Sequence, residues 1–170
     1  LHDIGKMGIP DDILNKSSLL TPDEKKIVEL HPVFAFDLLK DIKYLQSTIS
    51  IPYSHHENWD GKGYPQGLRG KEISLFARIF SVVDNWDALS SDRPYRDAWP
   101  REKVVEYIQE QSGKIFDPHI VEVFVNKVVP RLVEQLFSEQ ARIEHHKKHI
   151  LVHIEGAPLS SEKIASILLK

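Results

Sequence analysis

Apolar residues recur at helical spacing along most of this chain, and turn-forming residues separate the resulting segments. The clearest helix start is Thr21-Pro22-Asp23-Glu24. Thr21 can cap the helix, proline suits its first position, and Glu24 completes a capping box. Pro32 interrupts the apolar pattern that follows and places His31 at a junction between two helices. Further helices are expected over residues 45–57 with a bend near Pro52, over residues 75–89, from Pro100, and from Asp117-Pro118.

Residues 58–73 form a loop in which glycine is concentrated. Half of the 8 glycines of the chain lie there, namely Gly61, Gly63, Gly67 and Gly70. Glycine permits backbone angles and close approaches that other residues disfavour. Beyond the loop, apolar residues continue at helical spacing, at Val104, Val105, Ile108, Ile120, Val121, Phe124 and Val128. The pattern therefore predicts an all-α fold, a helical bundle.

The C-terminal part of the chain differs from the rest. Residues 138–149 are polar and helical in pattern, the mostly apolar residues 150–154 suit a short strand, and residues 161–169 predict a last helix. We therefore expect a domain over residues 1–129 and an extension or linker of unassigned role over residues 130–170. Four histidines lie in the extension, and a dry structural or a solvated role is favoured for them over a binding site: His145, His146, His149 and His153.

Composition narrows the classes of function. The 170 residues suit one domain, and 41% hydrophobic with 28% charged residues is ordinary for a globular protein. A net charge of -3 argues against a surface that wraps a nucleic-acid duplex. The chain has no cysteine, so any metal must be held by nitrogen and oxygen. No apolar run reaches the ~20 residues of a membrane span, and we expect a cytoplasmic module.

Six residues of metal-ligand type occur in the first half of the chain: His2, Asp3, His31, His55, His56 and Asp84. Neutral imidazole and carboxylate oxygen hold hard or borderline divalent metals. For any one histidine, a hydrogen-bonded core or surface role is the simpler interpretation, and Asp84 alone can be capped or salt-bridged. Together, their order favours a metal centre with more than one ion.

The spacing of these residues predicts how they share the ions. Consecutive helical residues point about 100° apart, so we expect Asp3 to bridge two ions while His2 holds one. His55 and His56 can serve neighbouring ions in the same way. Asp84 lies on an apolar helix, where a metal would remove the cost of an uncompensated carboxylate. Two ions roughly 3.5–4 Å apart can activate a bridging water and clamp a phosphoryl oxygen, which is the chemistry of phosphodiester hydrolysis.

Basic and aromatic residues near these ligands suit a substrate that carries phosphate. Lys6, one turn after Asp3, can stabilise charge on the phosphate or on the leaving oxygen. Arg93 and Arg96 can bind phosphate bidentately or stack on bases, or they can form structural ion pairs with neighbouring aspartates. Tyr64 can stack on a base, or it can pack within its turn.

The combined motifs resemble those of HD-GYP domains, a bacterial branch of the HD metal-dependent phosphohydrolases. The resemblance covers residues 1–129 and rests on the following segments: Leu1-His2-Asp3-Ile4-Gly5-Lys6, Gly8-Ile9-Pro10, His31-Pro32, His55-His56-Glu57, Asp60-Gly61-Lys62-Gly63-Tyr64-Pro65, Asp84-Asn85-Trp86-Asp87-Ala88-Leu89 and Ser91-Asp92-Arg93-Pro94-Tyr95-Arg96.

This resemblance implies a helical domain of the HD type with two or three divalent ions, iron or manganese. The implied reaction is hydrolysis of cyclic di-GMP to linear pGpG or GMP in bacterial second-messenger signalling. The implied metal ligands are His2, Asp3, His31, His55, His56 and Asp84, with Asp3 and Lys6 catalytic. The implied substrate-side residues are Gly63, Tyr64, Pro65, Arg93 and Arg96.

The resemblance also sets expectations about context. It implies a fused sensory or receiver domain and contact of the Gly63-Tyr64-Pro65 loop with diguanylate cyclase domains. Independently of the resemblance, exposed helices are compatible with a homodimer. Members of the family have a helix before the His-Asp pair that supplies another histidine, so we expect N-terminal helices to be missing from this sequence. Two alternatives stay open. One is a non-catalytic module that binds cyclic di-GMP or another protein, and the other is a hydrolase of a different nucleotide.

Overall fold

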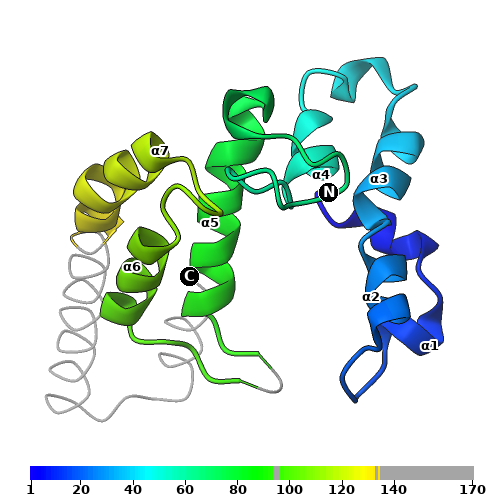
Figure 1. Cartoon of the computed structure of the whole chain (residues 1–170), viewed down its shortest axis with the longest axis horizontal. Helices are drawn as coiled ribbons and strands as arrows, with labels where there is room; N and C mark the ends of the chain where they lie inside the picture. Colours follow the sequence, from blue (N-terminus) through cyan, green and yellow to red (C-terminus); the bar gives the residue numbers. More distant parts are fainter. Residues whose placement is uncertain (94–95, 133, 135–170) are drawn as a thin grey trace, which may run out of the picture. The chain divides into compact units, whose positions relative to one another are not determined.

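The computed structural model describes residues 1–93, 96–132 and 134, and all regular elements in these ranges are helical (Figure 1). The all-α prediction is therefore confirmed, with only isolated β-bridges beside the helices in the described ranges. The helices are α1 (Asp11–Leu14), α2 (Pro22–Val28), α3 (His31–Leu39), α4 (Ser50–Ser54), α5 (Leu75–Ser90), α6 (Arg101–Glu110) and α7 (Pro118–Val123). Three 3₁₀ turns and one π turn complete the list: η1 (Ile4–Gly8), η2 (Lys43–Leu45), η3 (Gly70–Glu72) and η4 (Phe124–Val128).

The chain divides into two compact units, Leu1–Phe124 and Val125–Lys170. Every residue of the candidate site belongs to the first unit. The strand and last helix expected after residue 149, and the four tail histidines, lie outside the described residues. The expected domain boundary near residue 129 stays a prediction.

Local capping determines where several helices begin. Thr21 and Glu24 form the expected capping box, with Thr21 N donating to the Glu24 carboxylate at 2.7 Å and Glu24 N donating to Thr21 Oγ1 at 3.3 Å. Asp117 caps α7 by accepting from His119 N at 2.9 Å. Helix α1 was not predicted, although Pro10 followed by two aspartates is a typical helix start. At the starts of all three helices, α1, α2 and α7, neighbouring residues in the sequence provide the signal for the helix start.

The predicted helix over residues 45–57 is wrong in extent. Only Lys43–Leu45 and Ser50–Ser54 are helical there. The Thr48 hydroxyl donates to Leu45 O at 3.0 Å, and such side-chain bonds compete with the regular helical pattern. The helical spacing of apolar residues from Ile120 to Val128 also suggests one buried face, but Val128 is 37% exposed.

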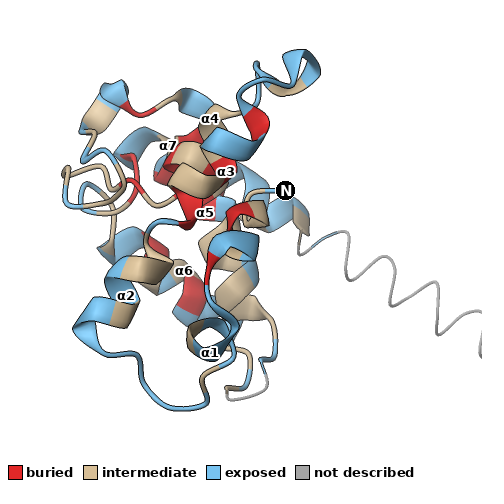
Figure 2. Cartoon of the chain, turned by 90° about the vertical axis from the view of Figure 1, so that its right-hand side faces the viewer, coloured by how far each residue is buried: buried red, intermediate tan, exposed pale blue. Residues whose placement is uncertain are grey.

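Helix α4 contacts α3 on one side and α5 on the other, and α5 also contacts α6 and α7 (Figure 1). Buried apolar residues line these contacts, and the buried stretches run along α5 and α6 in Figure 2. They are Ala77 and Val82 of α5, Val104 and Ile108 of α6, Val121 of α7, and Phe116 and Phe124 beside α7. At the edge of this core, Arg78 of α5 forms an ion pair with Asp117 at the start of α7.

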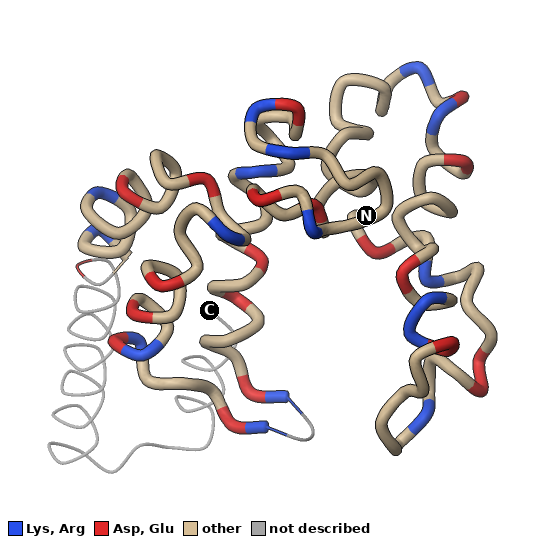
Figure 3. Tube along the Cα trace, in the orientation of Figure 1, with Lys and Arg blue, Asp and Glu red and all other residues tan. Residues whose placement is uncertain are grey.

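Basic and acidic residues are interspersed along the described chain, without a continuous basic tract (Figure 3). In the same ranges, none of the helices has the length and apolar character needed to cross a bilayer.

The turn η1 packs directly on α3 through Gly5. Gly5 is buried, and a Cβ atom at this position would lie 2.6 Å from Ala35 N and closer still to His31 O. Those neighbours are backbone atoms, so a rotamer change cannot relieve the overlap. The absence of a side chain at residue 5 therefore allows the segment that carries Asp3 to lie against the first turn of α3.

We predict that Gly5→Ala destabilises the chain by about 3 kcal/mol, because overpacking against backbone forces the two segments apart. Gly67→Ala is the matched control, since Gly67 has a positive φ of 68° but its nearest contact would be 3.7 Å away. It should cost only about 1 kcal/mol of backbone strain. Urea denaturation of both variants measures the difference. Equal losses at the two positions would contradict the proposed role of Gly5.

Candidate metal centre

Asp3, His31, His55 and His56 converge, with one potential ligand atom from each lying within 4.8 Å of all the others. Asp3 precedes η1, His31 is the first residue of α3, and His55 and His56 directly follow α4. Three segments that are distant in sequence thus supply one cluster. The structure brings together four of the six predicted ligands in this group.

Backbone carbonyls fix the tautomers of two of these histidines. His31 Nδ1 lies 2.8 Å from Val28 O, and His55 Nδ1 lies 3.1 Å from Pro52 O. Because a carbonyl only accepts, each Nδ1 must carry the proton, which leaves a lone pair on each Nε2. An imidazole N–H bound to a backbone carbonyl is a typical arrangement for a metal-ligating histidine.

The two Nε2 atoms face each other at 3.3 Å, and Asp3 Oδ1 lies 3.4 Å from His31 Nε2 and 3.8 Å from His55 Nε2. Neutral rings with this tautomer have no proton to share between their Nε2 atoms. Two lone pairs and a carboxylate oxygen therefore point at one another without a donor. A cation satisfies such a group, so the donor set fits a divalent metal ion.

Burial keeps the histidines neutral. Burial, the largest cause, together with positive charge on neighbouring histidines, lowers the pKa of His55 to about 4 and that of His56 to about 3. The pKa of His31 is also lowered, chiefly by burial. Neutral imidazole is the form that binds metals, so these ligands need no deprotonation near neutral pH.

The two oxygens of Asp3 face different partners. Oδ1 faces His31 and His55, whereas Oδ2 lies 3.3 Å from His2 Nε2 and 2.6 Å from Lys6 Nζ. Burial raises the pKa of the Asp3 carboxyl, but the hydrogen bond and charge of Lys6 outweigh burial and hold the pKa below its ordinary value. This divided arrangement is the one required of a bridging carboxylate.

Asp84 of α5 lies beside the four-residue cluster. Its Oδ1 is 3.8 Å from His2 Nε2, and its side chain is 36% exposed. Burial raises the pKa of the Asp84 carboxyl. His2 and Asp84 therefore form a second pair of potential ligands that meets the first group at Asp3.

The glycine-rich loop covers one side of the cluster. The Tyr64 ring stacks on His56 with centroids 4.8 Å apart and an interplanar angle of 22°. Gly63 lies against the backbone of residues 56–58, and the peptide bond between Tyr64 and Pro65 is cis. Burial raises the pKa of the Tyr64 hydroxyl, which stays protonated at neutral pH.

Glu57 is a residue to which the sequence assigned no role of its own. Its side chain is buried, and the carboxylate accepts from Gln66 N at 2.7 Å and from Leu68 N at 2.9 Å. Its position between His56 and the glycine-rich loop was the feature of the sequence that could have indicated a role for Glu57. The pattern could not reveal its partners, because they are backbone amides.

The two predicted phosphate-binding arginines have other contacts in this structure. Arg93 is exposed, and its backbone pairs with that of Arg96. Arg96 Nη2 donates to Ala88 O at 2.6 Å, near the end of α5, and its guanidinium lies 5.7 Å from the centre of the Trp99 ring. The contact with Ala88 satisfies a helix-terminal carbonyl.

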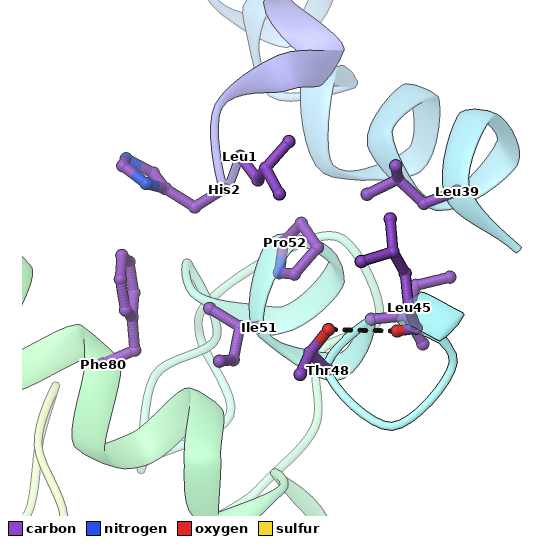
Figure 4. Close-up of a pocket in the computed structure, with 9 residues that line it drawn as sticks. Leu1, His2, Leu39, Leu45, Thr48, Ile51, Pro52 and Phe80 are labelled. Atoms are coloured by element: carbon purple, nitrogen blue, oxygen red, sulfur yellow. Dashed lines mark hydrogen bonds between the residues drawn. The ribbon is translucent and has the colours of Figure 1, made fainter. Parts of the chain in front are cut away.

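A cavity of about 240 Å³ opens beside His2 (Figure 4). Apolar side chains from several elements line most of it, including Leu1, Leu39, Leu45 and Phe80. Phe80 also packs against the His2 ring, with centroids 4.9 Å apart. The second ligand pair is therefore bordered by an apolar surface.

Residues 1–120 match the family described as HD domain. The chain belongs to this family, and the resemblance predicted from its motifs is confirmed. Members of this kind bind divalent metal, which agrees with the cluster of Asp3 and the three histidines.

Several relatives of known activity are similar to the chain. It is 44% identical over 127 residues to a cyclic di-GMP phosphodiesterase of Thermotoga maritima, covering 74% of this chain and 34% of the relative. It is 42% identical to the cyclic di-GMP phosphodiesterase response regulator RpfG of Xanthomonas campestris, with the same coverage. A 3'3'-cGAMP-specific phosphodiesterase 2 of Vibrio cholerae is 39% identical, covering 74% of this chain and 24% of the relative. The matched part thus spans about a third or less of each relative's length.

We predict that the chain binds Mn²⁺ and that His55→Ala weakens this binding by at least about 100-fold, since loss of even an outer partner of a ligand costs about 10–100-fold. His119→Ala is the control, because His119 is an 82% exposed histidine at the start of α7. Calorimetric titration measures both affinities. Unchanged affinity in a folded His55→Ala sample would exclude this histidine as a ligand.

Proposed function

We propose that this chain is a metal-dependent phosphodiesterase domain that hydrolyses cyclic di-GMP to linear pGpG or GMP. The observation that carries the proposal is the convergence of Asp3, His31, His55 and His56 with unprotonated nitrogens facing one another. The activities for which the Thermotoga and Xanthomonas relatives are named support the choice of substrate.

We infer two metal positions that share Asp3. The first would be held by His31, His55 and Asp3, and the second by His2, Asp84 and Asp3. The distances from each Asp3 oxygen to its neighbours support this division. A ring nitrogen of His56 lies within 4.8 Å of ligand atoms of Asp3, His31 and His55, so His56 can add to the first position. Iron and manganese suit a site of imidazole and carboxylate donors. Bound divalent ions lower the pKa of water and polarise a phosphoryl oxygen.

The residues of the chain then perform distinct tasks. Lys6 lies next to the Asp3 oxygen that faces His2, so its ammonium group can stabilise negative charge that develops on the phosphate or the leaving oxygen. Tyr64, beside Gly63 and Pro65, presents an aromatic ring at the edge of the cluster, where a guanine base can stack. Arg93, which is exposed, can reach a phosphate from the loop after α5, whereas Arg96 would first have to leave Ala88.

A second candidate substrate is 3'3'-cGAMP, because the Vibrio relative of comparable identity is named for it. Both substrates are cyclic dinucleotides with two phosphodiester bonds. The name of the Xanthomonas relative also supports a receiver-type regulatory domain in the native protein. Contact of the loop around Tyr64 with diguanylate cyclase domains is a further proposal that rests on the resemblance. Homodimerisation through exposed helices is a separate proposal.

We predict that protein loaded anaerobically with iron(II) or manganese(II) converts cyclic di-GMP to pGpG or GMP. Asp3→Asn should lose turnover and metal together, because Asp3 contributes to both inferred positions. Chromatography of the products and metal analysis of the same samples test both statements. If metal-replete protein leaves cyclic di-GMP intact but cleaves 3'3'-cGAMP, then 3'3'-cGAMP would replace cyclic di-GMP as the proposed substrate. Failure with both substrates would favour a non-catalytic binding module.

We predict that Lys6→Ala lowers kcat by about 10²–10³-fold, as expected for loss of one group that stabilises developing charge. Metal content should stay at the wild-type level, because lysine is not a ligand. Lys26→Ala, at a 75% exposed position on α2, is the control and should keep the wild-type rate. Steady-state kinetics with metal analysis measures the effect. A wild-type kcat in the Lys6→Ala variant would show that Lys6 does not take part in the reaction.

A further inference from the structure

We propose that Glu57 is a positioning residue that holds the Tyr64 ring over His56 and so shapes the substrate-binding edge of the metal site. This inference rests on the proposed function for its kinetic consequence. Its structural basis is independent of that function.

The carboxylate of Glu57 is buried and accepts hydrogen bonds from two backbone amides. The side chain is 2% exposed, and each of its two oxygens accepts from a different backbone amide, Gln66 N at 2.7 Å and Leu68 N at 2.9 Å. Burial of a charge requires such compensation. The two bonds fix residues 66 and 68 relative to the chain that follows α4.

The preceding part of the loop is attached to the same segment. Tyr64 N donates to His56 O at 3.2 Å, and a Cβ atom on Gly63 would lie 2.5 Å from Glu57 Cα. Gln66 Nε2 also donates to the hydroxyl of Ser54 at 3.3 Å. The loop from Gly63 to Leu68 therefore folds back on residues 54–58 and is held there at both ends.

These contacts determine where the Tyr64 ring lies. The ring stacks on His56 at 4.8 Å and approaches His31 edge-on at 6.5 Å. Two of the clustered histidines thus contact an aromatic side chain whose position depends on the hydrogen bonds of Glu57. An aromatic face at this point offers a stacking surface for a nucleobase.

The test uses Glu57→Gln in the metal-loaded chain. Glutamine keeps one acceptor oxygen and places an NH₂ group against the other backbone N–H, so two donors oppose each other. Hydrogen exchange of the Gln66 or Leu68 amide should rise at least about tenfold, while exchange in α6 stays unchanged. The control is Glu72→Gln, because Glu72 is an exposed glutamate of the same loop that accepts from Arg69 N at 2.8 Å.

Kinetics distinguishes positioning from a general loss of structure. Glu57→Gln should raise KM for cyclic di-GMP about tenfold, the effect expected for loss of one base stack, with kcat changed less than about threefold. Tyr64→Leu should raise KM to a similar extent. The double variant should be no worse than Tyr64→Leu alone, because Glu57 acts through Tyr64. Glu72→Gln should change neither constant.

Two results would overturn the proposal. One is wild-type exchange at both amides in Glu57→Gln, and the other is a KM in Tyr64→Leu equal to that of the wild type. The second result stays decisive even if Glu57→Gln fails to fold. If the wild-type chain shows no turnover, the proposed function fails, and the exchange comparison alone then decides whether Glu57 holds the loop.

Discussion

The candidate site depends on one close approach, that of the η1 backbone to the first turn of α3 at Gly5. Asp3 lies two residues before Gly5, and His31 begins the helix that Gly5 touches. The 3.4 Å separation of Asp3 Oδ1 and His31 Nε2 follows from this contact between two main chains. Side-chain packing can adjust by rotamer changes, but contact between backbones cannot. The position of the Asp3 carboxylate is therefore set by the absence of a side chain at residue 5.

A second constraint is electrostatic. The fold buries His31 and His55, fixes each Nδ1 proton on a backbone carbonyl, and directs both lone pairs toward Asp3 Oδ1. Without a cation, the two lone pairs and the Asp3 carboxylate repel one another, and this repulsion destabilises the packed arrangement. With a divalent ion, the same arrangement becomes favourable, so metal binding and stability of the first unit are linked. Lys6 contributes on the other side of Asp3, where its ammonium group balances part of the carboxylate charge.

Sequence patterns predicted the parts of this structure that short-range interactions determine. The helices that begin after Thr21 and Asp117 were predictable because their caps involve neighbouring residues. The convergence of Asp3 with His31, His55 and His56 was predictable because histidine and aspartate recur in a recognisable order. The carbonyls of Val28 and Pro52 were not predictable as partners of His31 and His55, since any residue supplies a carbonyl. The role of Glu57 was hidden for the same reason, because its partners are amides 9 and 11 residues later in the chain.

The adjacency of His56 and Glu57 joins the metal centre to the loop. His56 belongs to the ligand cluster, and the next residue holds the segment that carries Tyr64. A rotation of the backbone at this point would move both side chains. A ligand that tightens the loop would therefore also favour the orientation of His56 seen here. Because coupling between two sites is reciprocal in free energy, a metal ion that fixes His56 would strengthen binding at the loop by the same factor. The short segment after α4 can thus make metal binding and substrate binding cooperative without a large conformational change.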